Sequence, residues 1–398
     1  MPGLPVQTFR LRNFKAVRDS GTVKFSPFTV FIGNNGVGKS SLIEGLETFR
    51  SVVTDGLDEA LRPWLGLEHA LHKGTSHKSP IHPRKGREVM KHPLQFTING
   101  WLGSRKAHAH MEVGYRKGSA DDAWIESEYF HQRMERKHWR DGDTVSEKTL
   151  QQATGIGDGQ SILTQLREVS AHLDAWQFAL LDPNEMGLPR ATRRTRGRVR
   201  LARDGSNVAE YLLDIRTHRE GGVEAFEGIV ETLAYVLPYA EDLQPAITRE
   251  IERSAYLQLS EQGYADRNDK LPGWLLSTGT LRVLALLALL RDPDPPPLIV
   301  IEELENGLDP RTIHLIVSEI RDYVARGNRQ VIATTHSPYL LDLLDLDDLI
   351  LAERVASKKV GPHVTFSRPG DEARLVEWAQ DFSPGRLYTM GRLSQRNR

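Results

Sequence analysis

No cysteine occurs among the 398 residues of the chain, so disulfide bonds and thiol chemistry are excluded. The chain also has almost no net charge, because 52 basic residues stand against 53 acidic ones. No global field therefore draws the protein to nucleic acid or to a membrane surface, and any such binding must come from a local patch.

The sequence has no apolar run long enough to cross a membrane. The longest run, around 281–290, is interrupted by Arg282 and predicts a buried helix. The first residues lack the basic and then apolar pattern of a secretory signal. These absences predict a cytoplasmic protein without a membrane partner.

A glycine-rich loop between a predicted strand and a predicted helix dominates the first 55 residues. An apolar run over 28–32 precedes the loop, and one-sided helical spacing over 38–53 follows it. This context predicts a phosphate-binding loop, because glycines let backbone N–H groups point at a phosphate chain. Lys39 would reach the β- and γ-phosphates of ATP, and the Ser40 hydroxyl would bind Mg²⁺. The predicted ATP-binding residues are Gly33, Asn34, Asn35, Gly36, Val37, Gly38, Lys39, Ser40 and Ser41.

Two carboxylates follow a second apolar run, 298–301, which is typical of a strand in the middle of a parallel sheet. Glu302 would bind Mg²⁺ or its water ligands, and Glu303 would polarise the attacking water. His336 follows a predicted strand over 330–334, and it could hydrogen-bond a γ-phosphate or orient the water. Glu303 and His336 are therefore the candidate catalytic residues.

A second anion site is predicted at the start of the apolar helix over 276–290. Ser277 and Gly279 lie where free N–H groups and the positive end of the helix dipole are exposed. One chain thus holds two anion sites, which a single head could not bring to one phosphate.

Four segments resemble the ATP-site motifs of ABC-type ATPase heads, and they are most similar to the RecF/SMC/OLD-like group of AAA-family ATPases. These segments are 33–41, 276–280, 301–310 and 334–338, and 9–15 and 204–209 are also similar to that group. The resemblance implies that two heads sandwich two ATP molecules. Asp309 would then lie at the dimer interface. The signature residues, which would act in trans, are Ser277, Thr278, Gly279 and Thr280.

The chain departs from the wider family pattern in three places. Glu302 stands where many phosphate-loop ATPases have aspartate, although this group tolerates glutamate. The signature differs from the transporter form. Gln95 is only a candidate for the glutamine of the Q-loop.

We therefore predict an α/β fold, a P-loop NTPase with an ABC-type head. It would combine a mixed sheet flanked by helices, an antiparallel β subdomain and a mixed α/β insertion. The head would comprise 1–55 and 272–398, and 56–271 would be the insertion. Strands are predicted over 93–102, 108–115 and 122–131. A charged stretch over 131–150 is only weakly periodic, and the histidine-rich stretch over 69–92 predicts a polar loop without a metal site.

The predicted function is a Mg²⁺-dependent ATPase whose ATP-gated head dimerisation controls a nucleic-acid-linked process, such as anti-phage defence or DNA repair. Its partners would be a second copy, in a homodimer or a higher oligomer, and a separate effector such as a nuclease. Two alternatives stay open, the ATP-binding subunit of a transporter and an ATP-dependent scaffold with little turnover. No second acidic cluster follows the ATPase motifs, so no intrinsic nuclease is predicted.

An arginine-rich stretch over 190–203 is the candidate surface for DNA or RNA phosphates. A solvated charged loop, or a surface for an acidic partner, explains the same pattern. The predicted contacts are Arg193, Arg194, Arg196, Arg198 and Arg200.

Overall fold

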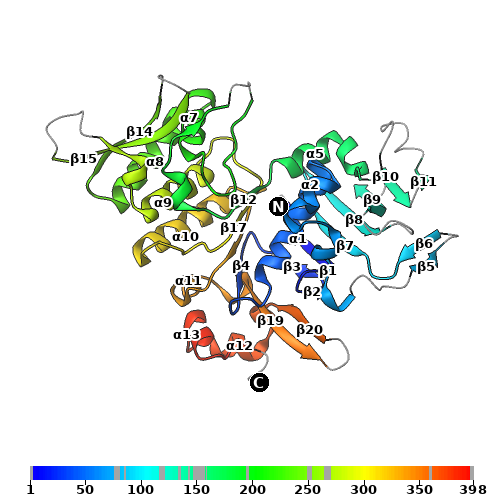
Figure 1. The fold of residues 1–398 in the computed structure, drawn as a ribbon. Coiled ribbons are helices and arrows are strands. Elements are labelled where there is room, and N and C mark those ends of the chain that lie inside the picture. Colours follow the sequence, from blue (N-terminus) through cyan, green and yellow to red (C-terminus); the bar gives the residue numbers. More distant parts are fainter. Residues whose placement is uncertain are drawn as a thin grey trace.

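The computed structural model describes most of the chain. The described residues are 3–75, 81–84, 87–115, 122–132, 136–141, 144–146, 157, 159–193, 197–248, 253–263, 270–357 and 361–394. In Figure 1, an N-terminal lobe in blue and cyan and a lobe in green and yellow flank a central sheet, with the orange and red C-terminal elements below. Within the described residues, no helix is long and apolar enough to span a membrane.

The central sheet has six strands across the described ranges, in the order β12-β17-β18-β4-β19-β20. The first five run parallel, and β20 is antiparallel to β19. The strands are β12 (Gln177–Ala179), β17 (Leu298–Ile301), β18 (Gln330–Thr334), β4 (Phe28–Ile32), β19 (Leu349–Ser357) and β20 (Gly361–Ser367). The strands predicted over 28–32, 298–301 and 330–334 are confirmed.

The apolar runs of these strands reflect a core on each face of the sheet. Alternate residues of β17 enter different cores, because successive side chains of a strand point to opposite faces. Ile299 and Ile301 pack with one cluster of buried side chains, and Leu298 and Val300 pack with the other. A strand buried on both faces carries no polar alternation.

Helices cover both faces of the central sheet. Helix α9 (Thr278–Leu290) is buried from Thr280 to its end, which explains why its sequence is apolar on every side. Helices α9 and α10 pack in the core that contains Ile299. Helices α1 and α5 pack in the core on the other face of the sheet. The helices that flank the central strands are α1 (Lys39–Thr54), α5 (Arg167–Asp174), α10 (Pro310–Ala325), α11 (Pro338–Leu341), α12 (Ala373–Trp378) and α13 (Pro384–Thr389).

An antiparallel sheet builds most of the N-terminal lobe. Eight of the described strands form it, in the order β11-β10-β9-β8-β7-β1-β2, with β3 also paired to β1. The strands are β1 (Thr8–Phe14), β2 (Val17–Asp19), β3 (Val23–Lys24), β7 (Leu94–Leu102), β8 (Arg105–Tyr115), β9 (Ala123–Gln132), β10 (Arg136–Asp141) and β11 (Thr144–Val145). The three strands predicted between 93 and 131 are confirmed as β7, β8 and β9.

Strand β10 lies in the charged stretch that the sequence left without structure. Its Arg140 is only 5% exposed, because the guanidinium pairs with Glu128 at 2.7 Å and donates to the backbone carbonyl of Gln160 at 2.6 Å. Because a charged residue fills a buried position of this strand, the sequence does not show the apolar alternation that predicts a strand. The stretch over 69–92 is not only a loop, since β5 (Ile81–Arg84) and β6 (Arg87–Met90) form a hairpin there. Short helices precede that hairpin at α2 (Leu57–Leu61), η1 (Arg62–Trp64), α3 (Leu67–Ala70) and η2 (Lys73–Thr75).

Residues 56–271 contribute strands to all four sheets of the described residues, including the hairpin of β5 and β6. Strand β7 extends the sheet of β1, and β12 is the edge strand beside β17. The remainder forms a small sheet, with strands β13 (Arg190–Ala191), β14 (Ala240–Ile247), β15 (Ser254–Glu261) and β16 (Leu271–Pro272). The other helices are η3 (Ile162–Gln165), α6 (Pro183–Met186), α7 (Val208–His218), α8 (Gly222–Val236), η4 (Gly273–Leu275), η5 (Leu346–Asp348) and η6 (Pro369–Asp371).

Candidate nucleotide-binding site

The predicted site residues follow three adjacent strands of the central sheet. Strands β17, β18 and β4 are parallel neighbours, so their carboxyl ends lie at one edge. The loop 33–38 follows β4, the two glutamates follow β17, and His336 comes shortly after β18. Lys39 is close enough to Glu303 and His336 for their charges to interact. The structure therefore brings together residues from three segments that are far apart in the sequence, 33–41, 301–310 and 334–338.

The phosphate-binding loop needs glycine at two positions for reasons of space as well as backbone angle. Gly33 has φ 142°, and a Cβ there would lie 2.3 Å from the carbonyl oxygen of Ala352. Gly38 has φ 111°, and a Cβ there would lie 2.6 Å from Val364. Gly38 is also the N-cap of α1 and has no side chain to cap the helix. No side chain therefore covers the first amides of α1, of which the Ser41 N–H donates to the Gly38 carbonyl at 3.1 Å, and this helix start suits an anion.

Lys39 is buried at the base of this loop and is only 7% exposed. Its Nζ donates to the carbonyl oxygens of Gly33 at 2.8 Å and Asn34 at 3.1 Å. Burial lowers the pKa of Lys39 to about 8, although Glu305 and Glu303 act against this shift. The carbonyl groups of the loop thus accept hydrogen bonds from the Lys39 ammonium. Asn34, Asn35, Gly36 and Ser40 are exposed, Val37 is partly buried, and Ser41 is buried in the first turn of α1.

Ser40 and Glu302 lie within hydrogen-bond distance of each other. The Ser40 hydroxyl donates a hydrogen bond to the Glu302 carboxylate, which is 8% exposed. Burial raises the pKa of Glu302, and the bonds from Ser40 and Arg203 oppose that rise. A hydroxyl and a carboxylate are the hard oxygen ligands that Mg²⁺ prefers, so these two residues fit a magnesium site.

Glu303 is exposed and has an unusual backbone conformation, with φ 53°. Its N–H donates to the Thr334 hydroxyl at 2.8 Å, and its carbonyl accepts from Arg282 at 2.8 Å. Its carboxylate accepts from the side-chain amide of Asn306 at 3.2 Å. The two backbone bonds hold this conformation, and the carboxylate is free to meet water at the edge of the site.

His336 is held through Glu305, a residue that the sequence reasoning missed. The His336 N–H donates to Glu305 Oε1 at 2.6 Å, and Glu305 Oε2 is buried without a hydrogen-bond partner among the described residues. Burial and the nearby Lys39 lower the pKa of His336, against the opposing effect of Glu305 and Glu303, and so favour the neutral imidazole. The signal for Glu305 was present, since it is the third acid of the segment that begins at Glu302.

The signature residues lie at the start of α9. Ser277 caps this helix by accepting from the Thr280 N–H at 3.1 Å. Gly279 packs so closely that a Cβ there would lie 2.7 Å from the carbonyl oxygen of Gly307. Asp309 caps α10 by accepting from Arg311 N at 2.9 Å, and its bonds to Thr312 lower its pKa. The contacts of Ser277, Gly279 and Asp309 thus lie on their own helix starts and on the 303–309 loop.

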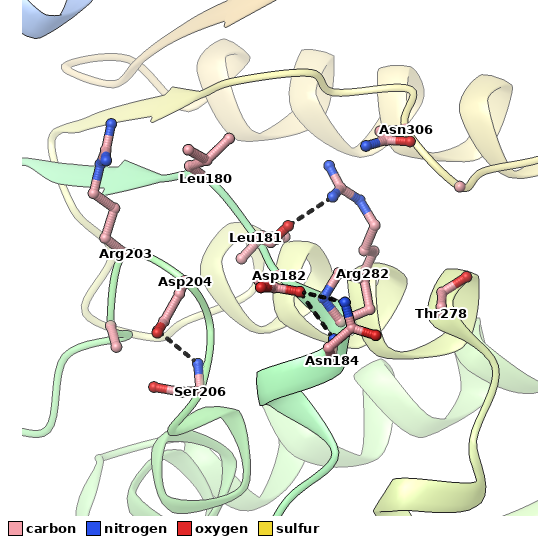
Figure 2. Close-up of a pocket in the computed structure, with 13 residues that line it drawn as sticks. Leu180, Leu181, Asp182, Asn184, Arg203, Asp204, Ser206, Thr278, Arg282 and Asn306 are labelled. Atoms are coloured by element: carbon pink, nitrogen blue, oxygen red, sulfur yellow. Dashed lines mark hydrogen bonds between the residues drawn. The ribbon is translucent and has the colours of Figure 1, made fainter.

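A cavity of about 860 Å³ lies beside the loop that follows the two acids, since Asn306 and Gly307 line it. Arg282, buried under it, joins both sides, because its guanidinium donates to the carbonyls of Leu181 and Glu303, each at 2.8 Å. Figure 2 shows Arg282 with Leu181 on one side and Asn306 on the other. The lining residues are Leu180, Leu181, Asp182, Pro183, Asn184, Ala202, Arg203, Asp204, Ser206, Thr278, Arg282, Asn306 and Gly307.

Most of the described arginines of the 190–203 stretch pair within the chain. Arg198 pairs with Asp294 at 2.6 Å, and Arg200 pairs with Asp174 at 2.7 Å. Arg193 is exposed, and its backbone N–H donates to Glu210 at 2.7 Å. Arg194 and Arg196 lie outside the described residues.

The structure gives Gln95 a place in the antiparallel sheet. It lies in β7, where its amide nitrogen donates to Glu112 at 2.7 Å and its oxygen accepts from Arg12 at 3.3 Å. The candidate Q-loop glutamine therefore bonds within that sheet.

Two family models match the chain. An AAA domain family, whose description names a candidate AbiEii toxin of a Type IV TA system, matches residues 181–342. An AAA ATPase domain family matches residues 6–60. The two matches include the phosphate-binding loop, the signature, both acids and His336. No curated protein matches the chain.

Several solved SMC head domains are similar to the chain at low sequence identity. The SmcHead bound to the C-winged helix domain of ScpA is 13% identical, with 95% of this chain and 99% of that chain covered and a TM-score of 0.48. The Smc head domain from Pyrococcus furiosus with an extended coiled coil, bound to the C-terminal domain of ScpA, is 12% identical, with 95% and 100% covered and a TM-score of 0.46. The SMC head domain from Thermotoga maritima is 14% identical, with 92% and 99% covered and a TM-score of 0.39.

Proposed function

We propose that the chain, which matches AAA-domain family models over 6–60 and 181–342, hydrolyses ATP with Mg²⁺ as a pair of ABC-type heads. One observation carries the proposal. The phosphate-binding loop, the two acids and His336 lie at the carboxyl ends of three adjacent parallel strands. Binding groups for a nucleotide and groups for hydrolysis thus share one edge of the sheet.

Each residue has a role that follows from its surroundings. The first amides of α1 and the Lys39 ammonium bind the phosphates, and Lys39 exchanges loop carbonyls for phosphate oxygens. Ser40 and Glu302 hold Mg²⁺, which would neutralise the charge that develops on the phosphates. Glu303 accepts a proton from the attacking water, because its carboxylate is exposed at the site. The neutral imidazole of His336 supplies one hydrogen bond to the γ-phosphate or the water.

A pair of heads would give a role to the signature residues at the start of α9. Ser277 and Gly279 make their contacts with α9 and the 303–309 loop of their own chain. A nucleotide held by the loop of one copy would meet these residues on the other copy. Closure of two heads on two nucleotides would then bring the signature of each copy to the nucleotide of the other.

We further propose that closure controls a separate effector in a nucleic-acid-linked process such as anti-phage defence. The description of the matched AAA domain family, which names a toxin of a Type IV TA system, supports this role. Arg193 and Arg198 are the exposed members of the predicted nucleic-acid contacts among the described residues, and Arg198 pairs with Asp294. The chain itself would not cleave DNA, because no second acidic cluster follows the ATPase motifs in the sequence.

Light scattering coupled to size-exclusion chromatography tests the pairing. Glu303→Gln should bind ATP and Mg²⁺ without turnover, and its mass should rise from 44.9 kDa to about twice that value. The double variant with Lys39→Ala is the matched control, and it should stay at one chain because it cannot bind the nucleotide. A Glu303→Gln protein that binds ATP, hydrolyses it at the wild-type rate and stays monomeric would refute the pair of heads.

A further inference from the structure

One arginine of the 190–203 stretch reaches the magnesium carboxylate. Arg203 Nη2 donates to Glu302 Oε1 at 2.9 Å, and its Nε lies 3.2 Å from Glu47 Oε1. The Glu302 side chain is 10% exposed and that of Glu47 is 26% exposed. The three residues come from different elements, because Glu47 lies on α1, Glu302 follows β17, and Arg203 precedes α7.

The arginine offsets a local excess of negative charge. Burial raises the pKa of Glu302, and the neighbouring Glu44 and Glu303 raise it further. Burial and Glu302 also raise the pKa of Glu47, whereas Arg203 lowers the pKa of both. Glu44 has its own cation, since Lys15 lies 2.6 Å from it. Arg203 thus pairs with both Glu302 and Glu47.

The backbone around Arg203 is anchored, so its side chain starts from a fixed point. The Leu180 N–H donates to the Arg203 carbonyl at 2.7 Å, and the Asp182 N–H donates to the Asp204 carbonyl at 2.9 Å. The Asn207 side chain accepts from the Ala202 N–H at 2.7 Å. Figure 2 shows Arg203 beside Leu180, on the segment that continues to Asp204 and Ser206.

We propose that Arg203 is a positioning residue of the magnesium site, which holds the Glu302 carboxylate beside Ser40 in the orientation that binds Mg²⁺. This inference rests on the proposed ATPase function. A partner behind a metal-binding carboxylate fixes its orientation, and the loss of such a partner weakens metal affinity about 10-fold to 100-fold. Arginine suits the position because its planar fork can bond two carboxylates at once, whereas lysine presents one compact charge.

The test is a Mg²⁺ titration of nucleotide binding, followed with a fluorescent ATP analogue on the full chain. Arg203→Ala should raise the Mg²⁺ concentration for half-maximal binding about 10-fold or more. Nucleotide affinity in the presence of a chelator should not change, because Arg203 does not touch the phosphate-binding loop. Arg203→Lys should restore part of the loss, since it keeps the charge but not the fork.

The matched control is Arg10→Ala. Arg10 also forms a two-bond ion pair at an intermediate exposure, to Asp19 at 3.0 and 2.7 Å, but it lies on β1 in the antiparallel sheet. Its Mg²⁺ requirement should equal that of the wild type. Circular dichroism establishes that each variant is folded, and Glu47→Gln gives a second route if Arg203→Ala is not. Glu47→Gln removes the ion pair between Arg203 and Glu47. It should raise the Mg²⁺ requirement by a smaller factor than Arg203→Ala does.

Two results would overturn the positioning role. One is an unchanged Mg²⁺ requirement in folded Arg203→Ala, which would show that Glu302 needs no such partner. The other is a lower requirement, which would show that Arg203 competes with the metal. A wild-type chain that binds nucleotide without any response to Mg²⁺ would instead refute the proposed function.

Discussion

The two helix starts that could bind phosphate differ in how their first amides are satisfied. Helix α1 begins after Gly38, which has φ 111° and no side chain, so no cap covers its amides. Helix α9 begins after Ser277, whose hydroxyl accepts from the Thr280 N–H. Glycine at the first start favours an external anion, whereas serine at the second stabilises the helix on its own.

The start of α1 therefore has the features of a binding site, whereas the start of α9 has those of a contact surface. The first start has a buried cation, Lys39, and a metal-binding pair behind it. The second has no lysine, and Gly279 is pressed against Gly307 of the loop that follows the two acids. We infer that the first start determines nucleotide affinity and that the second determines turnover. The variants below separate these two roles.

Lys39→Ala should have the largest effect, because it removes the cation of the first start. Nucleotide affinity should fall about 100-fold, which corresponds to about 2.7 kcal/mol of binding free energy. ATP hydrolysis and pairing of heads should be lost with it. Fluorescence titration with an ATP analogue measures the affinity, and retention of near wild-type affinity would mean that phosphate binds elsewhere.

Gly279→Ala should have an intermediate effect that is confined to the second start. The new Cβ would lie 2.7 Å from the Gly307 carbonyl oxygen, so α9 or the loop must move. Such overpacking costs about 1–3 kcal/mol within the chain, and a displaced signature that weakens the pairing of heads by about 1.4 kcal/mol would lower turnover about 10-fold. Nucleotide affinity of the single chain should stay at the wild-type value.

Gly159→Ala is the matched control for this substitution. A Cβ at Gly159 would lie 3.6 Å from Leu57, which is an ordinary contact. Steady-state hydrolysis and analogue binding should both equal the wild type. If Gly279→Ala lowers affinity and turnover together, the two helix starts do not have separate roles.

The catalytic strands could be predicted from sequence because burial on both faces leaves a continuous apolar run. Strands 28–32, 298–301 and 330–334 all show this pattern. Strand β12 could not be assigned to the same sheet, since three residues carry too little pattern and its partner β17 is far away in the chain. Strand β10 was hidden because Arg140 is buried in an ion pair.

The site shows the same division between local pattern and distant contact. Lys39, Glu302 and His336 belong to short segments whose residue types at fixed spacing predict their roles. Arg203 was concealed among neighbouring arginines, and only the fold shows that it reaches Glu302 while Arg200 turns to Asp174. A contact between residues far apart in the chain cannot be recognised from the local sequence around either residue.

The smallest expected effect is a change in the protonation of Lys39. It tests whether the Lys39 side chain is buried against the loop carbonyls before nucleotide binds. Burial lowers the pKa of Lys39 to about 8, so about half of the free protein lacks this proton at pH 8. Phosphate oxygens favour the charged form, so nucleotide binding raises the pKa and takes up about half a proton at pH 8. Nucleotide affinity should accordingly fall as the pH rises through 8.

Isothermal titration calorimetry in two buffers of different ionisation enthalpy measures this uptake. At pH 7 the lysine is mostly charged already, so the uptake should drop to about 0.1 proton. Lys39→Arg is the control, because its guanidinium stays charged and should remove the uptake while keeping a cation at the loop. Equal uptake in Lys39→Arg and the wild type would assign the proton to another group, and the lysine would then be charged before the nucleotide arrives.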